Sequence, residues 1–261
     1  MCVDNNYLDI VKKLNYVPVG LKNKNFSNEW ITDNSLINIS EKNPYYGEYT
    51  FYYWYWKNIL KKKKKDEWVG FCSYRELWGE HKNIKDKKSI KSLLKYLPKE
   101  WENYESIIGE PIFLKRPKIS KILKKGKIAL IRNYKEVFKS KYSIRLQFDM
   151  FHGNGVLDKA IELLSDKDKQ DFKNYIINNT SYNKGNMFIC KSKKIINEYY
   201  KTIFEWLNDC EKIFGFDLDG YGKARVYAFL AERFLPYWFN KYVKTLEWPI
   251  IFNDLTSEIN K

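Results

Sequence analysis

The sequence predicts an α/β fold, built as a single domain over residues 1–261, with a mixed, mostly parallel sheet flanked by helices. Helical and strand-like stretches alternate along the chain, which is the pattern of α/β proteins. The 261 residues are enough to bury a large core without staples. No internal repeat or flexible linker interrupts them, so one domain is the economical interpretation.

Local signals define the individual elements. Asn43 and Pro44 suit the N-cap and first position of a helix, and the lysines from Lys61 onward complement its carboxyl end. The two closing helices are amphipathic, and Pro236 is expected to kink the second. The predicted elements are a helix Asn43–Ile59, a strand Trp68–Tyr74, a helix Ser89–Leu97, strands Ile128–Ile131 and Ile144–Phe148, a helix pair within Asn154–Asn179, a strand Met187–Cys190, helices Ser192–Phe214 and Tyr221–Tyr242, and a strand Trp248–Phe252.

Composition excludes several classes of protein. Aromatic residues make up 18% of the chain, which argues against intrinsic disorder. The sequence contains no run of about 18 apolar residues, so it predicts no membrane-spanning helix. Its first residues lack the pattern of a signal peptide. The four cysteines form no zinc-binding spacing, and we interpret them as free thiols. These features together predict a cytoplasmic protein.

The chain is strongly basic, with 47 Lys and Arg against 32 Asp and Glu and a formal net charge of +15. Such an excess favours polyanionic partners, although an AT-rich coding bias toward lysine explains it equally well. Basic residues concentrate between Lys115 and Lys135, where no acidic residue occurs. The stretch suits a solvated loop, and it also suits a peripheral contact with anionic lipid on the inner face of a membrane.

The motifs of several enzyme classes are absent. The chain has no phosphate-binding glycine loop, no zinc-protease motif and no nucleophile elbow. Its two histidines, His81 and His152, are too isolated for a zinc site. Asp217 and Asp219 form a DxD pair, which many sugar transferases use to hold a metal and a diphosphate. They follow a helix end rather than a strand, so a turn or a helix N-cap is the favoured interpretation.

Asp149 and His152 are the predicted catalytic residues. Asp149 follows the predicted strand Ile144–Phe148, and His152 precedes a glycine turn. A carboxylate and an imidazole at a strand end suit acid–base chemistry, and the carboxylate also suits metal binding. A helix cap and a loop histidine explain the pair equally well. We predict Asp149 as the general base or as a ligand of Mn²⁺ or Mg²⁺, with metal dependence left open.

Two blocks of uncommon residues resemble a known family. The order and spacing of the residues resemble the patterns NIS-KN-Y-ELT-YW-WKN, GLCHYRR and NMFI…E…R…FLSER. These patterns belong to sugar transferases encoded in bacterial capsule and O-antigen clusters. The matching residues are Asn38–Thr50, Tyr53–Asn58 and Trp68–Arg75 in the first block, and Gly185–Ile189, Glu211, Arg225 and Phe229–Arg233 in the second.

The resemblance implies a GT-A-like fold and a hexosyltransferase activity. Members of the family act as galactosyl- or galactofuranosyltransferases that use a UDP-sugar. The implied partners are therefore a nucleotide-sugar donor and a glycan or lipid-linked saccharide acceptor in surface polysaccharide synthesis. A transfer of this kind needs positive charge or hydrogen-bond donors at the leaving diphosphate.

The matched blocks also supply candidate binding residues. Arg75 has the planar fork that suits a diphosphate, although an ion pair with Glu48 or Glu76 would explain it as well. The predicted donor-binding residues are Asn38, Ser40, Asn43, Tyr74, Arg75 and Asn186. The predicted supporting residues, for which structural bridging is the alternative, are Glu48, Lys57, Arg225, Glu232 and Arg233.

The sequence departs from the family pattern at three places. The pattern HYRR is Ser73–Glu76 here, and Gly185 stands where relatives often have His. The opening strand of the family is barely represented, so we expect the start to be clipped. Two other functions stay open. One is a transferase-like domain that has lost activity. The other is a basic nucleic-acid-binding module. Two observations argue against it: the aromatic residues lie at the spacing of core residues, and no nucleic-acid recognition motif occurs.

Overall fold

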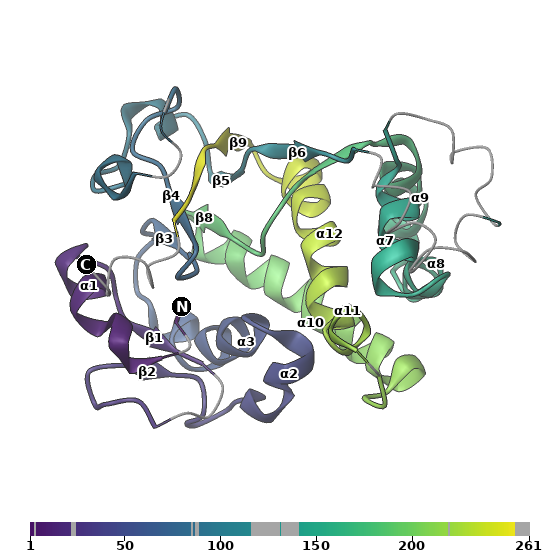
Figure 1. Cartoon of the computed structure of the whole chain (residues 1–261), viewed down its shortest axis with the longest axis horizontal. Coiled ribbons are helices and arrows are strands. Elements are labelled where there is room, and N and C mark those ends of the chain that lie inside the picture. Colours follow the sequence, from purple (N-terminus) through teal and green to yellow (C-terminus); the bar gives the residue numbers. More distant parts are fainter. Residues whose placement is uncertain are drawn as a thin grey trace. The chain divides into compact units, whose positions relative to one another are not determined.

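The computed structural model describes residues 1–2, 4–21, 25–84, 86, 89–115, 131, 141–218 and 220–253 (Figure 1). The chain divides into two compact units. The first consists of Met1–Glu110, Gly185–Lys201 and Phe239–Lys261, and the second of Pro111–Lys184 and Thr202–Trp238. The assignment of all 261 residues to a single domain stays a prediction.

The first unit contains most of the strands. Its elements are η1 (Asn5–Tyr7), α1 (Leu8–Lys13), β1 (Val19–Gly20), β2 (Ile31–Thr32), η2 (Ser40–Lys42), α2 (Asn43–Tyr46), α3 (Tyr49–Asn58), η3 (Leu60–Lys62), β3 (Val69–Gly70), β4 (Glu76–Trp78), η4 (Ile90–Ser92), η5 (Lys99–Trp101), β5 (Ser106–Gly109), β8 (Phe188–Cys190), β9 (Thr245–Trp248) and β10 (Ile250–Phe252). It also includes the start of α10 (Lys193–Phe214) and the end of α12 (Val226–Tyr242).

A four-stranded sheet of order β3-β8-β5-β9 forms the centre of this unit. The pairs β3–β8 and β5–β8 are antiparallel, and β5–β9 is parallel. Phe188 contacts the rings of Tyr52, Tyr199 and Phe239, which belong to α3, α10 and α12. Its neighbour Ile189 belongs to a second cluster with Trp101 and Trp248. Because successive side chains of a strand face opposite ways, both faces of this sheet are covered.

The mixed α/β class is thereby confirmed, but the expectation of a mostly parallel sheet is wrong for the described strands. Outside the four-stranded sheet, β1 and β2 pair in parallel, whereas β10–β4 and β6–β7 are antiparallel. Many of these pairings join strands of only two or three residues. Short antiparallel pairings of this kind need no helical crossover, which the alternation of predicted helices and strands had suggested.

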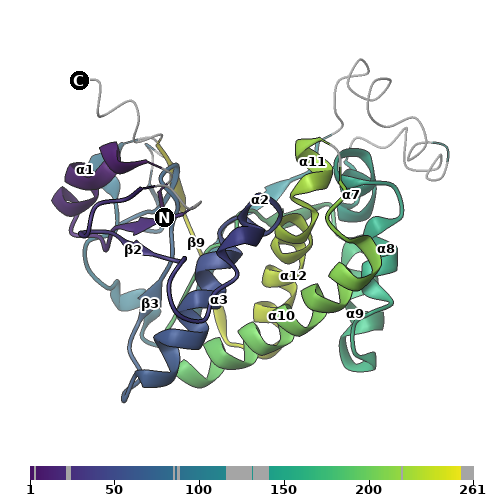
Figure 2. The same cartoon turned by 90° about the horizontal axis from the view of Figure 1, so that it is seen from below.

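The second unit is mainly helical. Figures 1 and 2 show α7, α8 and α9 side by side, and each of these helices contacts the other two. The elements of this unit are β6 (Pro111–Phe113), α7 (Ile144–His152), α8 (Val156–Ile161), α9 (Asp166–Asn178), β7 (Ser181–Asn183) and α11 (Tyr221–Ala224), with the remainder of α10 and α12.

The predicted strand Ile144–Phe148 is wrong, because these residues begin the helix α7. The Ser143 hydroxyl accepts a hydrogen bond from the backbone N–H of Leu146, which caps the helix. Ile144, Leu146 and Phe148 are all buried, and this alternation imitates a half-buried strand. The N-cap at Ser143 and the further buried residues Asp149, Met150 and His152, which continue past the alternating run, show why a helix forms instead.

Two helix predictions also need correction. The segment Ser89–Leu97 is not an α-helix: only Ile90–Ser92 forms a 3-10 turn, and the Leu94 N–H then donates to Trp78 O. The helix predicted from Asn43 to Ile59 is broken at Gly47, whose φ of 58° is a conformation that glycine adopts without strain. It therefore becomes two helices, α2 and α3.

Other predictions are confirmed. The helix pair within Asn154–Asn179 corresponds to α8 and α9, and the strand Met187–Cys190 to β8. The helix predicted for Ser192–Phe214 appears as α10, whereas the helix predicted for Tyr221–Tyr242 is divided into α11 and α12, and α12 continues through Pro236. The strand predicted for Trp248–Phe252 is divided between the end of β9 and β10. The prediction for Ile128–Ile131 concerns residues that, except for Ile131, lie outside those described. Among the described helices, none has the length and apolar character needed to cross a bilayer.

Candidate functional site

The two matched sequence blocks meet in the first unit through the side chains of Glu48 and Asn186. The Asn186 Nδ2 donates a hydrogen bond of 2.7 Å to the Glu48 Oε1. The Tyr52 hydroxyl donates to the backbone carbonyl of Asn186, which fixes the turn before β8. Glu48 is the N-cap residue of α3 and is half-buried, whereas Asn186 is buried. We call these two residues the Glu48–Asn186 pair.

A second carboxylate lies beside this pair. Gly185, which directly precedes Asn186, has a φ of 90°, where any residue with a Cβ would be strained. A Cβ at this position would lie 3.3 Å from Oε2 of Glu76. Glu76 therefore places its carboxylate against the turn that carries Asn186. A carboxamide bonded to one carboxylate, with a second carboxylate against the preceding residue, can bind the hydroxyl groups of a sugar.

Arg75 lies in the turn between β3 and β4. The Ser73 hydroxyl accepts hydrogen bonds from the backbone N–H groups of Arg75 and Glu76, at 3.3 and 3.0 Å. The Arg75 guanidinium carbon lies 4.8 Å from the ring centre of Tyr74, and the Arg75 side chain is exposed. The strand predicted for Trp68–Tyr74, which would end directly before Arg75, is wrong in its extent, because β3 contains only Val69–Gly70. An exposed guanidinium supported by an aromatic ring remains suited to bind an anion.

The predicted donor-binding residues before α3 build local turns. The Asn38 Oδ1 accepts hydrogen bonds from the Ser40 backbone N–H and the Ser40 hydroxyl, at 3.1 and 2.9 Å. The Asn43 Nδ2 donates to Gly47 O and to the Thr50 hydroxyl, which bridges the break between α2 and α3. These contacts give Asn38, Ser40 and Asn43 a structural role, and their contact with a donor stays a prediction.

Lys57 and Asp33 also belong to this unit. The Lys57 ammonium lies 3.4 Å from the ring centre of Trp56, near the end of α3. Asp33, which the sequence reasoning missed, directly follows β2 and is 1% exposed. Burial raises the pKa of Asp33, and a hydrogen bond with Thr50 partly offsets this. A carboxylate directly after Ile31–Thr32 was the available signal, since ligands bind at the carboxyl ends of parallel strands.

Asp149 and His152 belong to the second unit. Asp149 lies inside α7 rather than after a strand, and its Oδ1 accepts a 2.8 Å hydrogen bond from the Gly155 N–H. The His152 Nδ1 lies 3.1 Å from Gly222 O. Because a carbonyl oxygen can only accept, we assign the proton to Nδ1.

The chemistry of His152 is that of a neutral, buried imidazole. Burial, with a smaller contribution from Arg233, lowers the pKa of His152 to about 3. Its ring stacks on Phe229 with centroids 3.8 Å apart. A group with this pKa is a weak base at neutral pH. The catalytic roles of Asp149 and His152 therefore stay predictions. The observed contact of Asp149 holds the turn after α7, and that of His152 joins the end of α7 to α11.

The predicted supporting residues of α12 form part of the same unit. Arg233 is 1% exposed and forms an ion pair with Glu232. Its Nη2 donates a 3.0 Å hydrogen bond to Gln147 of α7, and its guanidinium carbon lies 4.0 Å from the Tyr182 ring centre. Arg225 lies at the start of α12, where its carbonyl accepts from the Phe229 N–H. Arg233 thus links α12 to α7, whereas its ion pair with Glu232 lies within α12, and the supporting roles predicted for Arg225, Glu232 and Arg233 stay predictions.

The described residues contain no group of three or more His, Cys, Asp or Glu side chains placed to hold a metal ion. Asp217 is exposed in the bend after α10, and Asp219 lies outside the described residues. Of the basic stretch Lys115–Lys135, only Lys115 and Ile131 are described. Metal binding and membrane contact therefore stay predictions.

Comparison with solved structures gives the class of fold. The chain is similar to the protein titled "WbbM bifunctional glycosyltransferase apo structure", with a TM-score of 0.62 and 18% sequence identity. The match covers 86% of this chain and 39% of that chain, so this chain spans well under half the length of that protein. The likeness confirms a glycosyltransferase-like α/β fold.

Residues 5–244 match the family model described as "Domain of unknown function (DUF4422)", and the chain belongs to that family. A search of curated proteins found no match. The family assignment covers both blocks, including Glu48, Arg75 and Asn186.

Proposed function

We propose that this chain is a glycosyltransferase that moves a hexose from a UDP-sugar to a glycan or lipid-linked saccharide in surface polysaccharide synthesis. The donor sugar is galactose, in pyranose or furanose form. The observation that carries the proposal is the hydrogen bond between Glu48 and Asn186, which joins two sequence blocks 138 residues apart. Support also comes from the glycosyltransferase-like fold, whose similar solved structure bears a glycosyltransferase title.

The polar residues of the two matched blocks suggest a division of roles. Arg75 neutralises the diphosphate of the donor, because its guanidinium is exposed and can bind two oxygens at once. The Glu48–Asn186 pair and Glu76 orient the hexose through its hydroxyl groups. A divalent cation, Mn²⁺ or Mg²⁺, would add charge neutralisation at the diphosphate. Glu48 and Glu76 offer the oxygen ligands that such a cation prefers.

A thermal-shift series tests this proposal. UDP, UDP-galactose and UDP-glucose, each with and without Mn²⁺, are added to the protein, and GDP-mannose serves as the control. A ligand that binds only the folded state raises the melting temperature by mass action. We expect a shift with the uridine nucleotides that exceeds the shift with GDP-mannose. No shift with any uridine nucleotide, with or without Mn²⁺, would contradict the proposal.

The nucleic-acid alternative loses support from the positions of the aromatic residues. Trp54, Tyr55 and Trp56 of α3 are buried, so they do not form a stacking platform at the surface. The membrane contact of Lys115–Lys135 remains part of the proposal for a lipid-linked acceptor. Flotation with neutral and anionic vesicles tests it, and equal binding to both would contradict it.

A further inference from the structure

Leu36 and Ile37 expose apolar side chains in the loop between β2 and η2. Leu36 is 71% exposed and Ile37 is 58% exposed. The φ of Leu36 is 52°, in the left-handed region, where a bulky side chain is strained. Backbone strain and exposed apolar surface both lower the stability of the fold, and an exposed leucine gains no packing in return. The two side chains therefore suit contact with a partner outside the chain.

The end of helix α3 fixes this loop in place. Asn58, the last residue of α3, is 5% exposed and bonds to both backbone groups of Ile37. Its Oδ1 accepts from the Ile37 N–H at 3.3 Å, and its Nδ2 donates to the Ile37 carbonyl at 2.8 Å. One turn earlier, the Trp54 Nε1 donates to the Ser35 hydroxyl at 3.1 Å. Because the loop is ordered before any partner binds, less entropy is lost on binding.

A cluster of lysines lies at the same end of α3. The run Lys61–Lys65 begins three residues after the last residue of α3, and all its members except Lys63 are exposed. Lys193, the first residue of α10, donates from its Nζ to the carbonyls of Lys61 and Lys63, at 3.2 and 2.8 Å. The start of α10 therefore lies beside this run. We call Lys61–Lys65, Lys193 and Lys194 the lysine cluster.

The acidic residues that follow the run are engaged within the cluster. The Asp66 Oδ1 accepts a 2.9 Å hydrogen bond from the Lys193 backbone N–H, and Glu67 forms an ion pair with Lys63. The first turn of α10 contains no acidic residue, although a helix N-terminus favours negative charge. Helix stability therefore does not explain Lys193 and Lys194, and consecutive lysines repel one another. The excess of positive charge suits a surface that carries many negative charges.

We propose that Leu36, Ile37 and the lysine cluster form a surface that docks on an anionic lipid bilayer. The two apolar side chains enter the interfacial layer of the bilayer, and the lysines contact the lipid phosphates. A nucleic acid would engage the lysines but would gain little from exposed aliphatic side chains, because its affinity comes from phosphate contacts. This surface is separate from the stretch Lys115–Lys135, and it does not depend on a transferase activity.

Vesicle flotation with Leu36→Asn tests the apolar part of this surface. Vesicles of phosphatidylcholine are compared with vesicles that also contain phosphatidylglycerol. We expect the wild type to bind the anionic vesicles at least about tenfold more strongly than the neutral ones. Leu36→Asn should weaken this binding by about tenfold, because an apolar side chain is lost. Its melting temperature should stay unchanged or rise, because asparagine adopts a positive φ more readily than leucine.

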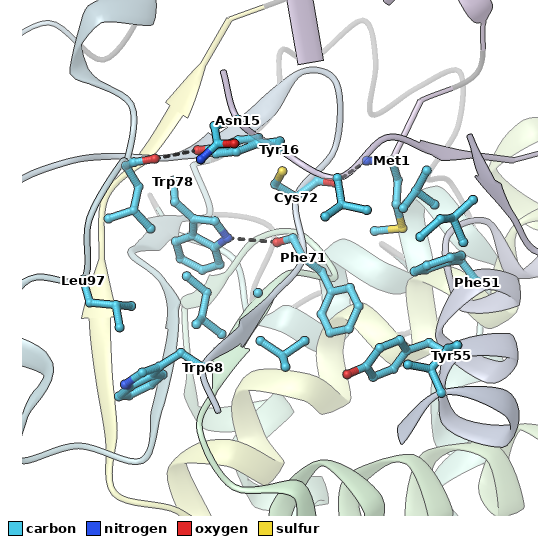
Figure 3. Close-up of a pocket in the computed structure, with 18 of the residues that line it drawn as sticks. Met1, Asn15, Tyr16, Phe51, Tyr55, Trp68, Phe71, Cys72, Trp78 and Leu97 are labelled. Carbon is cyan, nitrogen blue, oxygen red and sulfur yellow. Dashed lines mark hydrogen bonds between the residues drawn. The ribbon is translucent and has the colours of Figure 1, made fainter. Parts of the chain in front are cut away.

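Leu97→Asn is the matched control for the apolar contact. Leu97 is 57% exposed, and Figure 3 shows it on the side of a cavity away from Phe51 and Tyr55 of α3. The control should bind anionic vesicles within about twofold of the wild type.

Two triple variants test the lysines. The first joins Lys61→Gln, Lys62→Gln and Lys64→Gln, and it should bind anionic vesicles about 100-fold more weakly than the wild type. The second removes the same charge from scattered exposed positions of the same unit, through Lys13→Gln, Lys82→Gln and Lys91→Gln. Its binding should stay within about threefold of the wild type, because salt screens charges that lie far from the bilayer.

Three results would overturn the proposal. They are a wild type that binds neutral and anionic vesicles equally or binds neither, a Leu36→Asn variant that binds like the wild type, and two triple variants of equal affinity. Should Leu36→Asn fail to fold, Leu36→Gly takes its place with the same expected result, since glycine adopts a positive φ without strain. The thermal shift of the wild type with UDP tests the transferase proposal separately, so the two proposals can fail independently.

Discussion

The polar side chains singled out by the sequence lie in two different settings. In the first unit, Glu48 is half-buried and Arg75 is exposed, and the Glu48–Asn186 pair joins side chain to side chain. In the second unit, Asp149 and His152 are 4% and 7% exposed and bond to backbone groups of neighbouring turns. Side chains that hold turns stabilise the fold, whereas the exposed Arg75 and the half-buried Glu48 lie where a ligand can reach them.

This difference separates the residues that could act on a substrate from the residues that stabilise the fold. A carboxylate or guanidinium can act on a substrate only if the substrate reaches it, which favours Glu48, Glu76 and Arg75. A buried imidazole whose pKa is about 3 and a buried Arg233 in an ion pair instead stabilise the helices around α7. Mutations should therefore affect activity in the first unit and stability in the second.

The largest expected effect is on transferase activity at Glu48. Glu48→Gln keeps an Oε1 that can accept from Asn186, but it removes the charge. If the carboxylate acts on the donor, activity falls by about 100-fold while the melting temperature stays near that of the wild type. Transfer from UDP-galactose and a thermal melt measure the two quantities. Glu48→Ala is the companion variant, and equal activity of Glu48→Gln and wild type would assign Glu48 to structure alone.

The next effect concerns the pH dependence of stability through His152. Its pKa is about 3 in the folded protein and about 6.5 when unfolded, so below pH 6.5 the unfolded state binds the extra proton. The contribution of His152 is fully present above pH 6.5, and it is lost as the pH falls, by about 1.4 kcal/mol per pH unit. Denaturant titrations at pH 7.0, 6.0 and 5.0 compare wild type with His152→Asn. A slope unaltered by the substitution would show that His152 is not the titrating group.

Arg75 should affect ligand binding and leave stability unchanged. Its side chain is exposed, so Arg75→Ala is expected to melt within about 1 °C of the wild type. Loss of a charged hydrogen bond to the diphosphate should weaken UDP binding by about tenfold. Calorimetry with UDP measures this affinity. The affinity of Arg75→Lys should lie between those of the wild type and Arg75→Ala, because lysine keeps the charge but not the planar fork. Unchanged UDP affinity in Arg75→Ala would remove Arg75 from the site.

The smallest effect is expected at Lys57. Its ammonium lies over the Trp56 ring and near the carboxyl end of α3. The cation–π contact and the interaction with the helix dipole each contribute only modestly to stability. Lys57→Met should lower the free energy of unfolding by about 0.5–1 kcal/mol and leave transferase activity within about twofold. A loss of activity well beyond twofold, with no larger loss of stability than expected, would indicate that Lys57 contacts the donor.

The sequence correctly predicted the elements that are long and periodic or that form a continuous apolar run. Helices α10 and α12 have many periodic positions, and β8 is a continuous apolar run, so local pattern was sufficient. The strands β1 and β2 have two residues each, too few to show a period. They form because Ile31 N–H bonds to Pro18 O across the chain, which a local pattern does not contain.

The candidate site was predicted in its parts but not in its arrangement. Family resemblance marked Glu48 and Asn186, but their hydrogen bond depends on tertiary contact between segments 138 residues apart. Asp33 was missed because the strand before it is too short to recognise. Asp149 was placed at a strand end because burial at Ile144, Leu146 and Phe148 alternates, although the Ser143 cap begins a helix there.

Calorimetric binding of UDP-galactose to wild type, Asn186→Ala and Asn197→Ala tests the central claim most directly. Asn197 is a matched control, since its side chain is exposed and accepts from Trp56 Nε1 in the same unit. The account predicts that wild type and Asn197→Ala bind with similar affinity and that Asn186→Ala binds at least about tenfold more weakly. Equal binding by all three proteins, or no binding by the wild type, would contradict it.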